Sequence, residues 1–109
     1  MGSFTDYLEN KVLDHVVGKT SFTMPAVVAV ALFTAAPSDA GGGTEVTNAN
    51  NYARKTTAGT DWQAAASGAT QNTAAITFNV PSGSWGTVTH FAIMDSATYG
   101  AGNMLMWSA

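Results

Sequence analysis

The side chains that could do chemistry are few and scattered in this sequence. Two histidines and seven acids are present, and there is no cysteine. None of them are spaced like the ligands of a metal site, and no pair of acids suggests facing catalytic carboxylates. No serine lies in a nucleophile elbow, and the glycine run at 41–43 lacks the lysine of a phosphate-binding loop. The sequence therefore predicts no catalytic residue, no metal site and no cofactor, and we do not expect an enzyme.

The histidines and tryptophans have structural explanations. We expect His15 on the solvated side of a helix, and His90 inside a strand as a hydrogen-bonded residue or one at a subunit contact. Aromatic rings of this size usually fill a core or an interface. That is the expectation for Trp62, Trp85 and Trp107. A carbohydrate-binding module that touches a glycan through Trp85 or Trp62 is the alternative, with Trp85 better placed because it follows a turn.

Charge is unusually sparse. Charged residues make up 10 % of the 109 residues and the formal net charge is −3, whereas about 25 % charged residues is typical. Such a surface is either neutral and polar or covered by partners, which predicts an oligomer or a lattice member. There is no basic run, so we expect no nucleic-acid partner. The longest apolar-leaning stretch, 24–33, contains Pro25 and is too short to span a bilayer, so we expect no membrane partner.

The first twenty residues have helical spacing. Phe4, Leu8, Val12 and Val16 recur every four residues, which predicts an amphipathic helix over 4–17. Ser3 stands three residues before Asp6 in a capping arrangement, and Gly18 supplies a stop signal. The apolar side of this helix must pack on its own sheet or on a neighbour.

After Gly18 the apolar pattern changes to a period of two. Alternating residues between Gly, Ser and Asn clusters predict strands at 27–34, 52–57, 62–66, 73–80, 87–95 and 103–107. Short strands at such intervals are typical of an antiparallel β-sandwich or barrel. We therefore expect a mainly β single domain, 1–109, with the short N-terminal α-helix and a sandwich over 27–107. The expected core is Val28, Val30, Leu32, Ile76, Phe78, Phe91 and Ile93.

One loop, a basic pair on a predicted strand and the tail suit contacts with other chains. The glycine-rich stretch 37–43 predicts a loop that is mobile or wrapped round a partner. Arg54 and Lys55 beside Tyr52 suit an inter-subunit ion pair or an ordinary solvated edge. The apolar tail, 103–109, is either a last core strand or a segment donated to a neighbour.

Several stretches together resemble a known family. They are the opening 7–15, the strand 30–34 leading to Pro37, Glu45-Val46 followed by Tyr52-Ala53-Arg54, the segment 84–93, and 102–105. In this order they resemble a family of small tailed-bacteriophage virion proteins, often described as tail-fibre-like. The resemblance spans nearly the whole chain and implies a structural role in the virion, with the protein made in the host cytoplasm.

A compact domain of this length is too short to form a fibre by itself, so the leading hypothesis is a capsid cement or decoration protein on the outer surface of the shell. Such a protein bridges subunits of the major capsid protein and favours the assembled shell by linkage. A tail-fibre-associated or baseplate protein that binds tail proteins is the alternative. We expect a homo-oligomer, with a trimer favoured. Contacts are expected from the helix 4–17, the loop 37–51 and the tail, through Phe4, Leu8, Val12, Arg54, Trp85, Met104, Met106 and Trp107.

Overall fold

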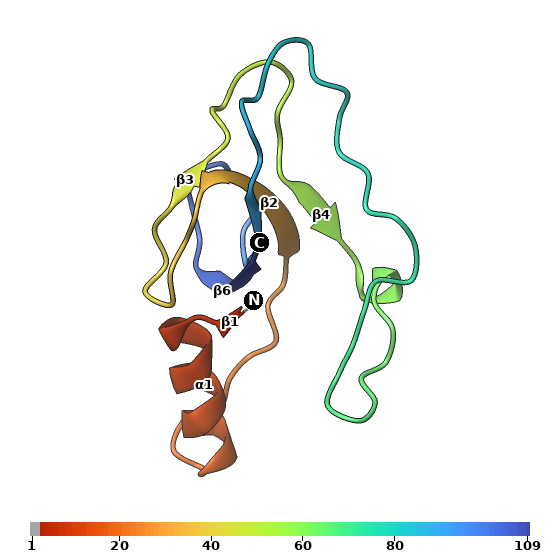
Figure 1. Ribbon diagram of the computed structural model, residues 1–109. Coiled ribbons are helices and arrows are strands. Elements are labelled where there is room, and N and C mark those ends of the chain that lie inside the picture. Colours follow the sequence, from red (N-terminus) through yellow and green to blue (C-terminus); the bar gives the residue numbers. More distant parts are fainter. Residues whose placement is uncertain (1–2) are drawn as a thin grey trace.

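The computed structural model describes residues 3–109 and contains one sheet and one α-helix (Figure 1). All strand pairs are antiparallel, in the order β1-β6-β5-β2-β3, with β4 also paired to β2. This confirms the predicted mainly β class with an N-terminal helix, and the strands lie in one open sheet. The elements are β1 (Ser3–Phe4), α1 (Asp6–Val16), β2 (Val28–Ala35), β3 (Thr44–Glu45), β4 (Lys55–Thr57), a 3-10 turn (Gly59–Asp61), β5 (His90–Met94) and β6 (Met104–Ser108).

Helix α1 begins two residues later than the sequence pattern suggested. Its N-cap is Thr5, not Ser3, and the Thr5 hydroxyl accepts a hydrogen bond from the Leu8 amide. The same hydroxyl donates to the Met104 carbonyl, so the cap also ties the helix to β6. Ser3 is instead part of β1, opposite Trp107. The helix ends as predicted, because Gly18 follows the C-cap with a φ of 79°.

Strand β2 organises the sheet. It pairs with β5 over Ala29–Phe33, and β5 pairs in turn with the apolar tail strand β6. Of the two alternatives for the tail, the chain uses it as a core strand of its own sheet. Successive residues face opposite sides, and two buried clusters result. One contains Ala31, Phe33, Ala92, Met94 and Met104, and the other contains Leu8, Val30, Ile93 and Leu105.

The other edge of β2 carries two short strands. Strand β4 pairs with Val28–Val30, and β3 pairs with Phe33 and Ala35. The chain reaches β3 through the glycine run, where Gly43 has a φ of 77°. A Cβ at Gly43 would lie 2.8 Å from the Pro37 nitrogen, so this turn requires glycine on both grounds.

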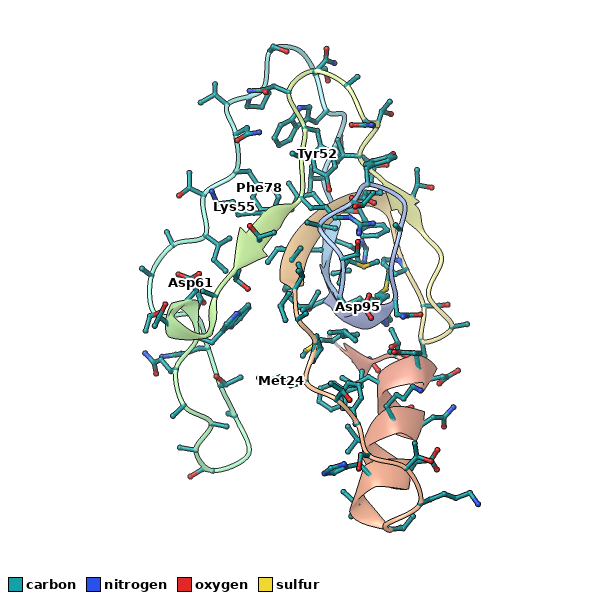
Figure 2. The ribbon with its side chains drawn as sticks, turned by 180° about the vertical axis from the view of Figure 1, so that it is seen from behind. Met24, Tyr52, Lys55, Asp61, Phe78 and Asp95 are labelled. Carbon is teal, nitrogen blue, oxygen red and sulfur yellow. The ribbon has the colours of Figure 1, made fainter. Side chains whose placement is uncertain are left out.

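Residues 58–89 form what we call the arm, a long coil that leaves β4 and returns to β5 (Figure 1). The strands predicted at 62–66 and 73–80 are wrong, because in this part of the chain only isolated bridges occur, such as Trp62 with Asn72. The apolar alternation at 73–80 corresponds to side-chain burial without strand pairing. Its middle part marks side chains that turn inward, since Ile76 and Phe78 pack against the second cluster, whereas Val80 is 82 % exposed. Figure 2 labels Phe78 on this strand-free segment.

The predicted core is confirmed in part. Val30 and Ile93 are buried, and Val28, Ile76 and Phe78 pack partly buried around them. Leu32 is half-buried. Phe91, however, is 39 % exposed. It faces the same side of the sheet as Ile93, two residues away, at a point where no element of residues 3–109 fully covers it.

Candidate functional site

A buried ionic network lies where β3, β4 and the loop before β6 meet. The Arg54 guanidinium binds the Glu45 carboxylate in two places, with Nη2 to Oε1 at 2.8 Å and Nε to Oε2 at 2.9 Å. Its Nη1 donates to the carbonyls of Ser96 and Ala101. Arg54 and Glu45 are 2 % and 10 % exposed in their side chains. The network joins three separate segments, and its bidentate geometry is the strong form of this interaction.

Tyr52 completes the network and supplies a hydrogen-bond acceptor for a backbone amide of β2 that no strand within residues 3–109 pairs with. The Leu32 amide lies between the parts of β2 that pair with β4 and β3, and it donates to the Tyr52 hydroxyl at 3.0 Å. That hydroxyl donates in turn to Glu45 Oε2 at 2.7 Å. Burial raises the pKa of Tyr52 well above its ordinary value. The hydrogen bonds to Glu45 raise the pKa of Arg54, so the guanidinium keeps its charge.

An apolar patch lies across β1, β5 and β6, at the margin of the second cluster. Phe4 opposes Met106 and Met106 opposes Ile93, so these side chains stand in one row across three strands. Phe4 is 47 % exposed and Phe91 is 39 % exposed. The hollow at this position has a volume of about 260 Å³ and no charged residue in its lining, which consists of Ser3, Phe4, Phe91, Ile93, Met106, Trp107 and Ser108. We call Phe4, Phe91, Ile93 and Met106 the apolar patch.

The predicted contact residues divide into two groups. Leu8, Arg54 and Met104 are buried within this chain. The ion pair of Arg54 is therefore made inside one chain, and neither the inter-subunit pair nor the solvated edge describes it. The second group is at least partly exposed. Phe4 and Val12 are exposed, and Met106, Trp107 and Trp85 are half-buried. The structure brings Phe4, Met106 and Trp107 together along one hollow and leaves Val12 on α1 and Trp85 apart from them.

All three tryptophan N–H groups are satisfied within the chain. Trp62 donates to the Thr57 hydroxyl and packs on the second cluster, and Trp107 donates to Asp39. Trp85 donates to the Asn50 carbonyl at 2.8 Å. A ring whose polar edge is bonded in this way has a fixed orientation. Trp85 lies beside a hollow lined mainly by polar side chains.

The histidines are placed as expected. His15 is exposed on α1, and its Nδ1 accepts a hydrogen bond from the Phe22 amide at 3.0 Å. His90 is half-buried in β5, 6.0 Å from the Trp107 ring. Across residues 3–109, no three side chains of the metal-ligating types gather closely enough to hold an ion. Within the same range, no helix has the length and apolar character needed to cross a bilayer.

The family model for the podophage GP4 fiber I protein gp80 matches residues 3–109, which is nearly the whole chain. This chain belongs to that family. The description of the gp80 family names a phage fibre protein. The chain is accordingly a phage virion structural protein of a fibre family. No curated protein matches the chain.

For this gp80 family member, the structure adds residues that the sequence pattern did not reveal. Glu45 is one of the scattered acids of the sequence, and in the structure it is the partner of Arg54. The sequence did hold a signal for this pair. In a chain with so few charges, an acid and a base nine positions apart flank a loop between two strands, which favours an ion pair across that loop. Asn50, which holds Trp85, carried no such signal, since its role depends on a contact across 35 positions.

Proposed function

We propose that this chain is a small structural subunit of the virion's fibre apparatus and that it associates with copies of itself through the apolar patch. The observation that carries the proposal is the uncharged hollow between Phe4, Phe91 and Met106 on an open sheet. Exposed apolar surface of this kind, continuous with a buried core, is typical of subunit contacts. The gp80 family description supports the fibre location, and tail proteins are then the partners.

The sheet edge supports self-association as well. Strand β1 is the outermost strand and has only two residues, both beside the patch. Within residues 3–109 no other strand pairs with its outer side, and an edge of this kind can pair with another chain. The C-terminal end of α1 and its cap residue, where Leu13, Val16 and Val17 are each at least 60 % exposed, offer a second apolar contact surface. A trimer is the assembly that we expect.

The test combines two patch substitutions with a matched control. Sedimentation velocity of the native chain is expected to show an oligomer, and Phe4→Ser with Phe91→Ser is expected to shift it to monomer. The control is Val27→Ser, because Val27 is 38 % exposed, like Phe91, but lies outside the hollow. The control should keep the native sedimentation coefficient. A native chain that stays monomeric at high concentration, or a double variant that keeps the oligomer, would overturn the assignment.

A second location, on the capsid, is supported by the shape of the molecule. Its extents are 48 × 28 × 25 Å, so one copy is too short to make a fibre by itself. As a cement protein, it would bind the major capsid protein on the outer shell, where many weak contacts act together. The copy number in purified virions, measured by quantitative mass spectrometry, separates the two locations. A handful of copies supports the fibre location, whereas numbers close to those of the major capsid protein support the cement role.

A further inference from the structure

A second hollow lies at the end of the molecule opposite α1. There the loop after β3 and the final part of the arm come together (Figure 1). The hollow has a volume of about 490 Å³, and none of its lining side chains is charged. Five of the eight lining residues carry a hydroxyl or an amide. The lining consists of Thr34, Thr47, Ala49, Asn50, Ser84, Trp85, Gly86 and Thr87.

Asn50 makes this hollow rigid by joining its two walls. Its carbonyl accepts hydrogen bonds from the Trp85 indole at 2.8 Å and from the Ser82 amide at 3.1 Å. Its side-chain amide donates to the Ser84 carbonyl at 2.9 Å. A Cβ at Gly83 would lie 2.8 Å from the Asn50 side chain, so a larger residue there would displace the Asn50 amide from the Ser84 carbonyl. Sites held by such cross-links bind without a large ordering cost.

Trp85 is fixed from two directions and still reaches the surface. Its ring meets the ring of Tyr52 edge-on, with centroids 5.4 Å apart and an interplanar angle of 84°. Tyr52 is in turn held by Glu45 and the Leu32 amide. Trp85 is half-buried, so part of its ring is available to a ligand. The hollow therefore presents an aromatic surface whose orientation is set by the buried network.

We propose that this groove binds a neutral saccharide. The face of an aromatic ring carries negative potential and attracts the C–H groups on one side of a sugar ring. The hydroxyls of Thr47 and Thr87 form no side-chain hydrogen bond within residues 3–109, and they line the groove ready to pair with sugar hydroxyls. The absence of lining charge disfavours a sulfated or phosphorylated ligand. The groove lies away from the apolar patch, so its use does not depend on self-association.

The test titrates the native chain with methyl glycosides of glucose, galactose, mannose, rhamnose and N-acetylglucosamine, followed by amide chemical shifts. We expect saturable shifts at residues 47–50 and 84–87 with at least one of these sugars. Thr47→Val with Thr87→Val keeps the side-chain shape and removes two hydroxyls. Each lost hydrogen bond should raise the dissociation constant by up to about tenfold. Trp85→Leu should abolish the shifts.

The matched control is Trp62→Phe, which changes a tryptophan outside the groove and should leave the dissociation constant unchanged. The threonine variant guards against a folding artefact, because both side chains are exposed. Absence of saturable shifts with every sugar would overturn the proposal, as would equal binding by the native chain and the threonine variant. The patch variant Phe4→Ser with Phe91→Ser should still bind the sugar, so the two proposals fail separately.

Discussion

The sheet and the arm differ in composition and in how they are held together, because the strands β2, β5 and β6 are mainly apolar and the arm is mainly small and polar. In the sheet, residues of β2, β5 and β6 are buried against each other, with Ala29, Ala31 and Ala92 fully enclosed. In the arm, residues 58–89, every side chain is exposed or half-buried. The arm contacts the sheet through Trp62, Ile76 and Phe78. The sheet is therefore the source of stability, and the arm is attached to it at a few points.

The difference also separates the two proposed roles. The apolar patch lies on the sheet, where strand register fixes the positions of its side chains. The saccharide groove lies where the arm returns, and it is fixed by Asn50 and Tyr52 instead. Irregular segments on a rigid scaffold commonly carry recognition, because they tolerate change without unfolding the domain. The radius of gyration of 14.5 Å exceeds the roughly 13 Å of a compact domain of this length, which fits an extended arm.

The largest effect is expected from breaking the ionic network of the sheet. Arg54→Met leaves the buried Glu45 carboxylate without its partner, and it removes the donors to the Ser96 and Ala101 carbonyls. Loss of one member of a buried pair costs about 3–5 kcal/mol. The free energy of unfolding, measured by urea denaturation, should fall by that amount.

The control for this prediction is the double change Glu45→Gln with Arg54→Met, which removes both charges. It should be more stable than Arg54→Met alone, because no uncompensated charge remains. A single variant with nearly native stability would show that water reaches Glu45 and that the network does not hold the sheet.

The sequence predicted the sheet better than the arm, and the reason is physical. Helix α1 and strands β2, β5 and β6 have periodic apolar residues and local turn signals, and all four were predicted close to their observed bounds. The stretch 73–80 has the same alternation, but no neighbouring strand pairs with it. Period two reports which side chains turn inward, whereas a strand also needs a partner for its backbone.

The site was predictable only in part, for a related reason. Phe4 was expected at a contact as part of the apolar side of the helix, and Met106 as part of the apolar tail, and the structure places both on the apolar patch. The pairing of Glu45 with Arg54, and that of Asn50 with Trp85, depends on loops that close across many residues. Neither composition nor periodicity specifies how such loops meet.

A pair of phenylalanines compares the two regions directly. Phe33 is 4 % exposed in the first cluster, and Phe78 is half-buried on the arm. Phe33→Ala should lower the free energy of unfolding by about 3–5 kcal/mol because it leaves a cavity in a packed core. Phe78→Ala should lower it by about 1 kcal/mol, since only part of the ring is removed from water.

Hydrogen exchange separates local from global effects in these two variants. Phe78→Ala should speed amide exchange within the arm while leaving β2 and β5 protected, because the arm can open alone. Phe33→Ala should speed exchange throughout the sheet. Equal losses of stability in the two variants would mean that the arm is an integral part of the core.

An effect confined to alkaline pH is expected for Tyr52, which contacts both regions. Its pKa is raised in the folded chain by burial, from an ordinary value near 10. Below that pH the hydroxyl is protonated in both states and adds no pH dependence. Above it, the unfolded chain loses the proton while the folded chain keeps it, so stability falls by up to about 1.4 kcal/mol per pH unit. Urea unfolding at a series of pH values above 10 measures this slope.

Tyr52→Phe should flatten the slope, while lowering stability at neutral pH because the Leu32 amide loses its acceptor. Tyr7→Phe is the matched control, because it removes a phenol hydroxyl that bonds neither the Leu32 amide nor Glu45. Because the folded chain keeps the Tyr52 proton and the Tyr52 ring supports Trp85, the groove should stay intact until the chain unfolds. Tryptophan fluorescence should therefore change in the same urea transition as the sheet at each pH. A fluorescence change without a stability change would mean that Tyr52 orients the groove but does not secure β2, and that the two regions are less closely joined than this contact implies.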